Sequence, residues 1–324
     1  MISIFAKAYK RGQNVITILM AAYNGEKYIA EQIESILYQT ELNWKLIIQD
    51  DCSSDGTFAI AESYAHRYPD RISAVRRITP SGSAQNNFFS MLHFADSEYI
   101  MFCDDDDVWL PEKIHVSLLK MKKLEKAFSN ETPLLVHTDL RVTDSELNTI
   151  SDSLMHMQKL NPTRTDLNHM FIQNIVTGCT VMVNRHLLKL SVEHSLPQHA
   201  VMHDWWFALI ASSLGQIDFS PEVTVLYRQH ENNQVGAKRA NAVRYNLRRF
   251  ADADGAHRSL TEAYEQAKEF LTLFGALLDD NQQQLVQTFI SIPSHSKLGR
   301  LFLICKYNFW RTGLFRKVGQ IWFS

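Results

Sequence analysis

Short apolar runs alternate with helical patterns over the first third of the chain. Val15–Ala21 is apolar, uncharged and partly β-branched, as a buried strand is, and Glu26–Gln39 follows with apolar residues at helical spacing. The same alternation predicts three more strands and two more helices: Lys45–Gln49, Ile72–Ile78 and Glu98–Cys103, then Thr57–Tyr68 and Ala84–Phe94. Strands that alternate with helices need crossover connections. The pattern therefore predicts an α/β fold with a mostly parallel sheet flanked by helices.

The second part of the chain is less regular. We expect a helix closed by Gly215, Asp204–Leu214, and four short strands: Leu134–His137, Thr180–Val183, Ile217–Phe219 and Thr224–Tyr227. From Ala237 onward the pattern is mainly helical. A chain of 324 residues has room for one large domain and an appendage. We predict a domain over residues 1–236 and a helical C-terminal region over 237–324, with the boundary near Gly236.

Composition narrows the class of protein. The formal net charge of −2 argues against a globally basic nucleic-acid binder, so we expect no nucleic-acid partner. No apolar run approaches the roughly 20 residues that span a bilayer, and residues 1–13 lack the apolar core of a secretory signal. The cysteines are too scattered for a disulfide framework or a zinc site: Cys52, Cys103, Cys179 and Cys305. These features favour a cytoplasmic protein with reduced thiols.

Polar clusters follow three of the predicted strands. They are Ala22–Glu26, Asp50–Thr57 and Asp104–Asp107. In a parallel α/β sheet, ligands bind beyond the carboxyl ends of the strands. We therefore expect all three clusters at one edge of the sheet, with several carboxylates around a single crevice.

The four consecutive aspartates Asp104–Asp107 are the sharpest chemical signal. Adjacent carboxylates repel one another, and burying them without compensation is costly. Mg²⁺ or Mn²⁺ prefers such oxygen ligands and commonly binds substrate phosphates as well. The alternative is a solvated acidic turn. An apolar strand leads into the cluster and Val108–Pro111 leads out, so the turn is held against a core and a metal site is favoured.

The cluster after the second strand has two compatible interpretations. Ser, Asp and Gly suit a tight turn and the cap of the next helix. Asp50 or Asp51 can also accept a hydrogen bond from the ring N–H of uracil or thymine. The pattern GxGxxG and the P-loop pattern GxxxxGK[ST] are both missing here, which argues against a dinucleotide oxidoreductase or a P-loop kinase.

Together these segments resemble a known family. VITILMAAYNGEKYIAEQIESILYQT, IIQDDCSSDGT and FCDDDDVWLPEK are similar to the nucleotide-binding half of the family-2 glycosyltransferases. The resemblance implies a GT-A fold, a nucleotide sugar bound through a DxD motif, and inversion at the anomeric carbon. TGCTVMVN, HDWW and YRQHENNQVG further resemble the bacterial rhamnosyltransferase-like branch, which uses dTDP-rhamnose to build surface polysaccharides.

The resemblance assigns roles to individual residues. Those expected around the nucleotide base are Ala22, Tyr23, Glu26, Asp51 and, close by, Asp50. In the aspartate cluster, Asp104 is expected near the ribose, Asp106 on a metal that bridges the two phosphates, and Asp107 in support of that site. Asp105 stands where the branch often has Gln. We include Asp105 in the nucleotide-sugar-binding set but expect its side chain to point away.

The later motifs supply the other candidates. Asp204 of HDWW matches the family's base position, and a helix N-terminus should keep this carboxylate ionised and ready to accept a proton. The alternative is that Asp204 only caps the helix. His230 is a candidate third metal ligand or diphosphate contact, and Arg228 a candidate phosphate contact. A lone His or Arg is more often structural. Cys52 stands where the family commonly has Gly.

The end of the chain has a distinct charge pattern. From Asn281 to Ser324 there is no Asp or Glu, while six basic residues interleave with apolar ones: Lys297, Arg300, Lys306, Arg311, Arg316 and Lys317. This composition suits a helix on an anionic membrane. The alternatives are packing on the catalytic domain or a dimer contact. A lipid-linked glycan acceptor would lie at the membrane, so we expect a peripheral protein at its inner face.

The sequence thus predicts a metal-dependent inverting glycosyltransferase with a dTDP- or UDP-linked sugar as donor. L-rhamnose from dTDP-rhamnose is the best candidate, and the acceptor is expected to be a bacterial surface polysaccharide or lipid-linked glycan. One alternative is a non-catalytic nucleotide-sugar- or glycan-binding protein of the same fold. Another is a Mg²⁺-dependent nucleotidyltransferase, although no Gly- and Arg-rich phosphate loop follows the first strand.

Overall fold

The computed structural model describes residues 16–230 and 253–323 of the chain. Its first part alternates strands and helices as the sequence predicts: β1 (Ile16–Ala22), α1 (Ile29–Leu37), β2 (Trp44–Asp50), α2 (Thr57–Arg67), β3 (Ile72–Arg76), α3 (Ala84–Met91) and β4 (Tyr99–Asp104). The four strands pair in the order β3-β2-β1-β4, and every pair is parallel. This half of the sheet therefore confirms the predicted parallel topology.

The second part extends the same sheet with both strand directions. Its elements are β5 (Val108–Trp109), α4 (Lys113–Phe128), β6 (Leu134–Thr143), β7 (Thr149–Ser151), α5 (Leu154–Met157), α6 (Leu167–Ile172), β8 (Val181–Asn184), α7 (Arg185–Glu193), α8 (His203–Leu214) and β9 (Gln216–Arg228). The order continues β4-β8-β6-β9-β5, and β7 pairs with β6. β8 runs antiparallel to both neighbours, whereas β9 is parallel to β6. The α/β class is confirmed, with a mixed sheet.

One strand replaces two predicted short ones. β9 is continuous over the stretch in which Ile217–Phe219 and Thr224–Tyr227 were expected separately. Its pairing with β6 passes from Ser220 to Val223, so the register skips the two residues between them, one of which is a proline. A proline has no N–H to give to the ladder, and such residues are tolerated where the register shifts.

The sheet separates two apolar layers, because successive side chains of a strand point to opposite faces. In β1, Ile18 and Met20 belong to the layer under α1, α2 and α4, while Leu19 and Ala21 belong to the layer under α3 and α8. α8 is buried on nearly all sides, as expected of a helix enclosed between a sheet and further helices.

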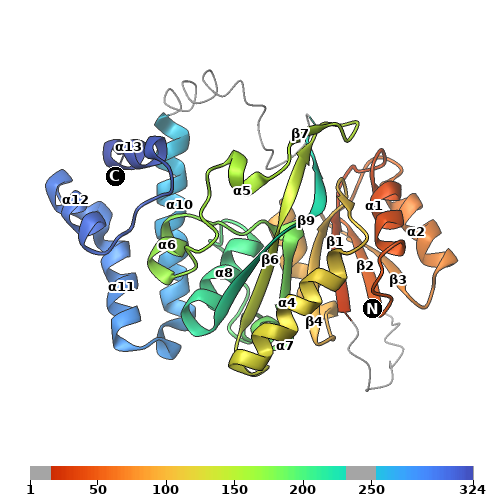
Figure 1. The fold of residues 1–324 in the computed structure, drawn as a ribbon, viewed down its shortest axis with the longest axis horizontal. Helices are drawn as coiled ribbons and strands as arrows, with labels where there is room; N and C mark the ends of the chain where they lie inside the picture. The colour runs from red at the N-terminus through yellow and green to blue at the C-terminus, as the bar shows by residue number, and fades with distance from the viewer. Residues whose placement is uncertain (1–15, 231–252, 324) are drawn as a thin grey trace.

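The C-terminal helices complete that second layer. They are α10 (Ala253–Phe274), α11 (Asp280–Ser291), α12 (Lys297–Lys306) and α13 (Leu314–Phe323), and they stand beside α6 and α8 at one end of the molecule (Figure 1). Phe270 lies 5.8 Å from Phe171 of α6 and 5.7 Å from Trp206 of α8, measured between ring centroids. This region therefore packs on the part of the chain that contains the sheet, one of the alternatives left open above. The predicted boundary near Gly236 lies outside the described residues.

Among the described residues, no helix combines the length and the apolar character that crossing a membrane requires.

Candidate active site

A cleft of about 880 Å³ opens at the carboxyl ends of β1 and β4. Residues that follow these strands line it, among them Tyr23, Asp104 and Asp106. Asp204, in the first turn of α8, lines the same cleft. Members of the three strand-end clusters predicted to surround one crevice line it together, and the candidate base Asp204 lines it with them.

The aspartate turn is held against the loop that follows β1. Asp105 Oδ2 accepts a hydrogen bond of 2.9 Å from the backbone N–H of Tyr23, and Asp105 lines the cleft. The expectation that Asp105 points away is wrong, because this backbone donor draws its carboxylate inward. A Cβ on Gly25 would lie 2.3 Å from Asp105 Oδ2, so a side chain there would displace the Asp105 carboxylate from its present position.

His230 comes to the same turn from the end of β9. Its Nε2 lies 2.9 Å from Asp106 Oδ2, and its ring packs 4.9 Å from that of Tyr28. Both His230 and Asp106 line the cleft. Asp107 is fully buried behind them, where its Oδ1 accepts a 3.1 Å hydrogen bond from the backbone N–H of Arg228. Asp106 and His230 of the predicted metal set are thus in contact, Asp104 lines the same cleft, and Asp107 lies behind the turn.

The crowded carboxylates resist ionisation. Burial, together with the charges of Asp106 and Asp204, raises the pKa of Asp104 to about 7. Burial, and then the charge of Asp106, raise the pKa values of Asp105 and Asp107 well above their usual range. A hard divalent cation would remove this repulsion, and the oxygens of Asp104 and Asp106 are ligands that Mg²⁺ or Mn²⁺ prefers. The donor set therefore fits the expected cation.

A second group of possible ligands fits less well. Atoms of Asp104, Asp107 and Cys179 lie within 4.8 Å of one another. Burial raises the pKa of the Cys179 thiol well above its usual value, with the charges of Asp107 and Asp104 adding to the effect. A protonated, soft and fully buried sulfur does not suit Mg²⁺ or Mn²⁺, so this group fits such a cation less well than Asp106 and His230 do.

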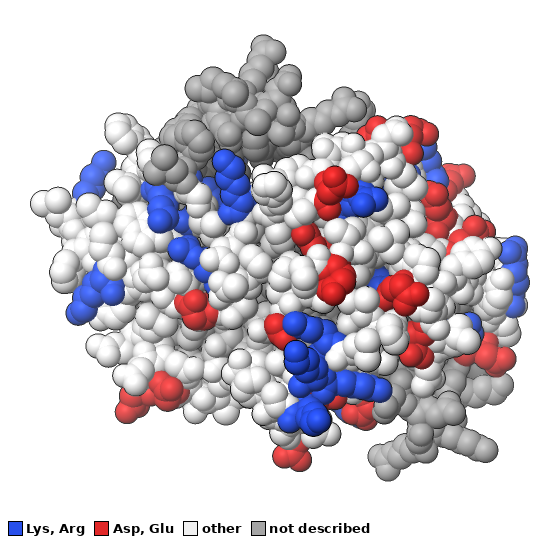
Figure 2. All heavy atoms as spheres, in the orientation of Figure 1, with Lys and Arg blue, Asp and Glu red and all other residues white. Residues whose placement is uncertain are grey.

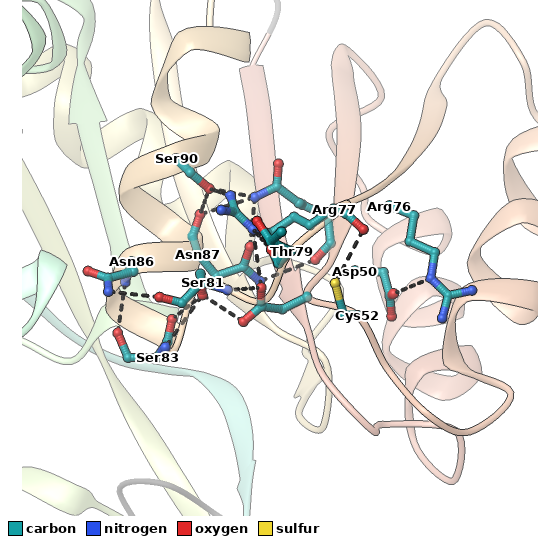
Figure 3. Close-up of polar contacts among 12 residues, drawn as sticks. Asp50, Cys52, Arg76, Arg77, Thr79, Ser81, Ser83, Asn86, Asn87 and Ser90 are labelled. Atoms are coloured by element: carbon teal, nitrogen blue, oxygen red, sulfur yellow. Dashed lines mark hydrogen bonds and ion pairs between the residues drawn. The ribbon is translucent and has the colours of Figure 1, made fainter.

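Asp51 connects the cleft to the loop after β3. Its carboxylate accepts hydrogen bonds of 2.6 Å from the backbone N–H and from the hydroxyl of Ser81. Arg77 Nε lies 3.2 Å from Asp51 Oδ1, and Figure 3 shows Arg77 and Ser81 in this polar network. Asp51 lines the cleft and fixes one side of it. The turn that follows Asp51 has a left-handed residue, Cys52, with φ of 62°.

Three residues that were predicted to bind the nucleotide sugar do not line the cleft. Asp50 is fully buried, accepts a hydrogen bond from Ser53 and pairs with Arg76 (Figure 3). Glu26 accepts a 2.9 Å hydrogen bond from the backbone N–H of Gly56 and braces that turn. Neither lines the cleft. Both side chains contact the loop after β2, although Asp50 Oδ1 has no hydrogen-bond partner among the described residues. The structure therefore places neither residue at the cleft, which corrects the expectation that they line it.

Arg228 is the third of these corrections. Its side chain is buried, pairs with Glu31 of α1, and donates hydrogen bonds of 2.8 Å to Asp106 O and 2.7 Å to Ser145 O. It does not line the cleft. Arg228 therefore shapes the aspartate turn from behind and is not placed to bind phosphate, because its guanidinium is already surrounded by protein acceptors.

Asp204 is held at the cleft by hydrogen bonds to one of its carboxylate oxygens. Its Oδ1 accepts hydrogen bonds of 3.1 Å from Asn174 Nδ2 and of 2.6 Å from its neighbour's backbone N–H. Burial raises its pKa to about 7, although these hydrogen bonds and one from the N–H of Gly178 lower it. The expectation that the helix N-terminus keeps Asp204 fully ionised is therefore wrong, since burial outweighs the dipole. Met202, not Asp204, is the N-cap residue of α8.

Three residues around Asp204 were not predicted: Asn174, Gly178 and His203. His203 is buried at the cleft and packs 4.0 Å from Phe88, and burial lowers its pKa to about 3, so its ring is neutral. Its two ring nitrogens have no hydrogen-bond partner in the part of the chain that the structure describes. A Cβ on Gly178 would lie 2.8 Å from His203 Nε2, so glycine is needed there.

The family model described as Glycosyl transferase family 2 matches residues 17–189, more than half of the chain. The chain belongs to glycosyl transferase family 2. The matched residues include the aspartate turn, whereas Asp204 and His230 lie beyond them. The dTDP-rhamnosyl transferase RfbG of Shigella flexneri is 31% identical over 238 residues, which are 70% of this chain and 76% of that protein.

Two solved glycosyltransferase structures resemble this family 2 enzyme in fold. TarS 1-349 of S. aureus, in complex with UDP-GlcNAc, has a TM-score of 0.54 and 13% identity, over 95% of this chain and 91% of that one. The mannosyltransferase PcManGT of Pyrobaculum calidifontis, in complex with GDP-Man and Mn²⁺, has a TM-score of 0.50 and 15% identity, over 95% and 82%. The GT-A-type fold implied by the sequence is confirmed.

Proposed function

We propose that this family 2 enzyme is a metal-dependent, inverting glycosyltransferase that takes its sugar from a nucleoside diphosphate. The observation that carries the proposal is that Asp106 and Asp204 line one cleft. The reaction needs a counter-charge for a departing diphosphate and a base for the acceptor hydroxyl, and these residues supply the groups for both.

Residues at the carboxyl ends of the strands would hold the donor. The loop after β1 with Tyr23, together with Asp51, would bind the base, and Asp105 would keep that loop next to the aspartate turn. Asp104, Asp106 and His230 would hold the Mg²⁺ or Mn²⁺. When bound, the cation would neutralise charge on the diphosphate leaving group. The Mn²⁺ complex of PcManGT supports this assignment.

Asp204 would act on the acceptor. As the acceptor oxygen bonds to the anomeric carbon and the bond to the diphosphate breaks, Asp204 would take the proton of the attacking hydroxyl. A pKa of about 7 suits this step, because a base works best when its pKa is near the operating pH. Attack from the side opposite the leaving group inverts the anomeric centre.

For the sugar, we propose L-rhamnose from dTDP-rhamnose. The similarity to RfbG supports this choice. Apolar side chains on the Asp204 side of the cleft also suit the methyl group of a deoxysugar: Leu154, Leu160, Ile175, Val176, Val201 and Met202. The acceptor would be a bacterial surface polysaccharide or a lipid-linked glycan.

A donor panel tests the proposal. The purified chain is incubated with dTDP-rhamnose, UDP-glucose, UDP-GlcNAc or a nucleoside triphosphate, with Mn²⁺ or with a chelator. We expect release of dTDP from dTDP-rhamnose in Mn²⁺ only. Binding without turnover would point to a non-catalytic binding protein, and release of pyrophosphate from the triphosphate would point to a nucleotidyltransferase.

We also propose that the enzyme works at the inner face of the cell membrane, in contact with anionic lipid. α12 and α13 expose Leu298 (80%), Phe302 and Trp322 (73%), and residues 281–324 carry no acidic side chain. On the face seen in Figure 2, basic side chains lie spread over this end of the molecule. Apolar side chains beside basic ones suit the surface of an anionic bilayer.

Vesicle sedimentation tests the membrane contact. We expect the chain to sediment with phosphatidylglycerol vesicles and to stay in solution with phosphatidylcholine vesicles. Phe302→Ser with Trp322→Ser should abolish sedimentation. Tyr38→Ser, which changes an equally exposed aromatic residue at the end of α1, should not. Equal sedimentation of both variants would count against the proposal.

A further inference from the structure

The wall of the cleft that carries Asp204 is built from two loop regions. Residues 154–178 and 200–204 contribute most of its lining, and short helices interrupt them. Loops have few backbone hydrogen bonds of their own, so something else must hold them in place. In this protein the C-terminal helices make those contacts.

The connection between α12 and α13 binds the first loop region through polar groups. Arg311 Nε donates a 3.2 Å hydrogen bond to Ile172 O, and the backbone N–H of Thr312 donates one of 2.6 Å to Gln173 Oε1. Arg316 Nη1 donates one of 2.8 Å to Gln158 O, whose residue lines the cleft. Two basic residues expected to face a membrane are therefore engaged with backbone carbonyls of the cleft wall.

Two further bonds run in the opposite direction. Arg164 Nη1 donates to Trp310 O at 3.0 Å, and Asn168 Nδ2 donates to Tyr307 O at 3.1 Å. Side chains of the connection therefore bind the wall, and side chains of the wall bind the connection. This is more than apolar contact, because hydrogen bonds of this kind fix direction as well as distance.

α10 holds the second loop region. Gln266 Oε1 accepts a 2.8 Å hydrogen bond from the backbone N–H of Val201, and Gln266 is fully buried. The carboxylate of Glu269 accepts hydrogen bonds from the backbone N–H groups of Gln198 and His199 at 2.8 and 2.6 Å. The loop that these contacts fix leads directly into α8 and Asp204.

The contacts continue to the proposed base. Ile172 and Gln173, which Arg311 and Thr312 hold, are followed directly by Asn174, whose Nδ2 binds Asp204 Oδ1. The approach to Asp204 is therefore fixed from both sides by residues of the C-terminal helices.

We propose that the C-terminal helices are a working part of the active site, and that Arg311 is a positioning residue that holds Asn174, and through it Asp204, where the acceptor must bind. This inference rests on the proposed function and assigns a role to a region beyond the residues that the family model matches. The donor half of the cleft, formed by the loops after β1, β2 and β4, makes none of the contacts described here. Loss of Arg311 should therefore affect turnover and not nucleotide binding.

The test compares Arg311→Met with Arg300→Met. Arg300 is a matched control, because it donates to His295 O and Pro293 O within its own region and touches no wall residue in those bonds. For each variant we would measure hydrogen exchange of residues 167–176, the dissociation constant of dTDP in Mn²⁺, and kcat and KM for hydrolysis of dTDP-rhamnose with water as acceptor.

For Arg311→Met we expect faster exchange in residues 167–176, an unchanged dissociation constant for dTDP, and a kcat lowered about tenfold or more with an unchanged KM. A small misplacement of a reacting group can cost about a hundredfold in rate. Arg311→Lys, which keeps a donor, should recover part of the kcat. Arg300→Met should match the wild type in all three measurements.

Two results would overturn the inference. One is a kcat for Arg311→Met equal to that of Arg300→Met. The other is a parallel loss of dTDP binding and kcat, which is the mark of general destabilisation. A wild-type protein that releases no dTDP would instead contradict the proposed function, and the exchange of residues 167–176 would still decide whether Arg311 holds the wall.

Discussion

Asn174 Nδ2 lies 3.1 Å from Asp204 Oδ1 and donates a hydrogen bond to it. This bond favours the charged carboxylate, whereas burial favours the protonated one and raises the pKa of Asp204 to about 7. The protonation of the proposed base is therefore set by a balance between the closed cleft and a few donors that can be removed one at a time.

Replacing Asp204 should stop the chemistry and leave nucleotide binding intact. Asp204→Asn keeps the shape but cannot accept the proton, so we expect kcat for dTDP-rhamnose turnover to fall about 10²–10⁴-fold. The dissociation constant of dTDP in Mn²⁺ should not change. Asp218→Asn is a control, since Asp218 lies on β9, pairs with Lys120 of α4 and does not line the cleft. Turnover equal to that of the wild type in Asp204→Asn would show that Asp204 is not the base.

The rate should depend on pH in a defined direction. The base works only when ionised, so kcat/KM should rise with pH through a midpoint near 7, the pKa of Asp204. Asn174→Ala removes a donor that lowers this pKa, so the midpoint should move to higher pH. Asn148→Ala, which changes an exposed amide bonded to Asp144, should leave it in place. A midpoint of the kcat/KM profile at lower pH in Asn174→Ala than in the wild type would contradict this prediction.

Gly25 should be intolerant of a side chain. A Cβ there would lie 2.3 Å from Asp105 Oδ2 and would push apart the loop after β1 and the aspartate turn. Overpacking of this kind costs about 1–3 kcal/mol, so the affinity for dTDP in Mn²⁺ should fall about tenfold or more in Gly25→Ala. Gly319→Ala meets no atom within 4 Å and should bind dTDP like the wild type. Equal affinities in calorimetry would show that the two loops need not touch.

We expect His203 to lower the free energy of unfolding relative to an apolar residue at the same position. It is buried against Phe88, and its ring nitrogens have no partner in the described part of the chain. His203→Phe fills a similar space without polar atoms, so the free energy of unfolding should rise by about 1–3 kcal/mol in urea denaturation. His156→Phe, at an exposed position in α5, should change it little. A lower stability of His203→Phe would mean that its ring is satisfied in solution.

The strands of the parallel half were predictable because they are short and mainly apolar, with a helix between each consecutive pair. α4 (Lys113–Phe128) was not predicted, since its many lysines weaken the apolar periodicity. β9 was predicted as two strands, because its continuity depends on its pairing with β6. That pairing runs on past the residues between Ser220 and Val223, where the register shifts. Such pairing is a tertiary property that a pattern of residues along the chain does not contain.

The sequence predicted that the site lies at the ends of the strands, but not which side chains there line it. The position of Asp104–Asp107 after an apolar strand indicated the cleft, but neighbouring residues at a strand end point in different directions. The sequence therefore did not separate Asp51, which lines the cleft, from Asp50, which pairs with Arg76. Asn174 was missed because it lies in a loop without periodicity. Arg228 was misassigned because its partner, Glu31, is remote in sequence.

The proposed reaction depends most on a cation held by the aspartate turn facing Asp204. The most direct measurement is dTDP release from dTDP-rhamnose by the wild type and by Asp106→Asn, in chelator and with added Mn²⁺. We expect the wild type to be inactive in chelator and restored by Mn²⁺, and Asp106→Asn to stay inactive at Mn²⁺ concentrations that saturate the wild type. Undiminished release in chelator, or by Asp106→Asn, would contradict the central claim.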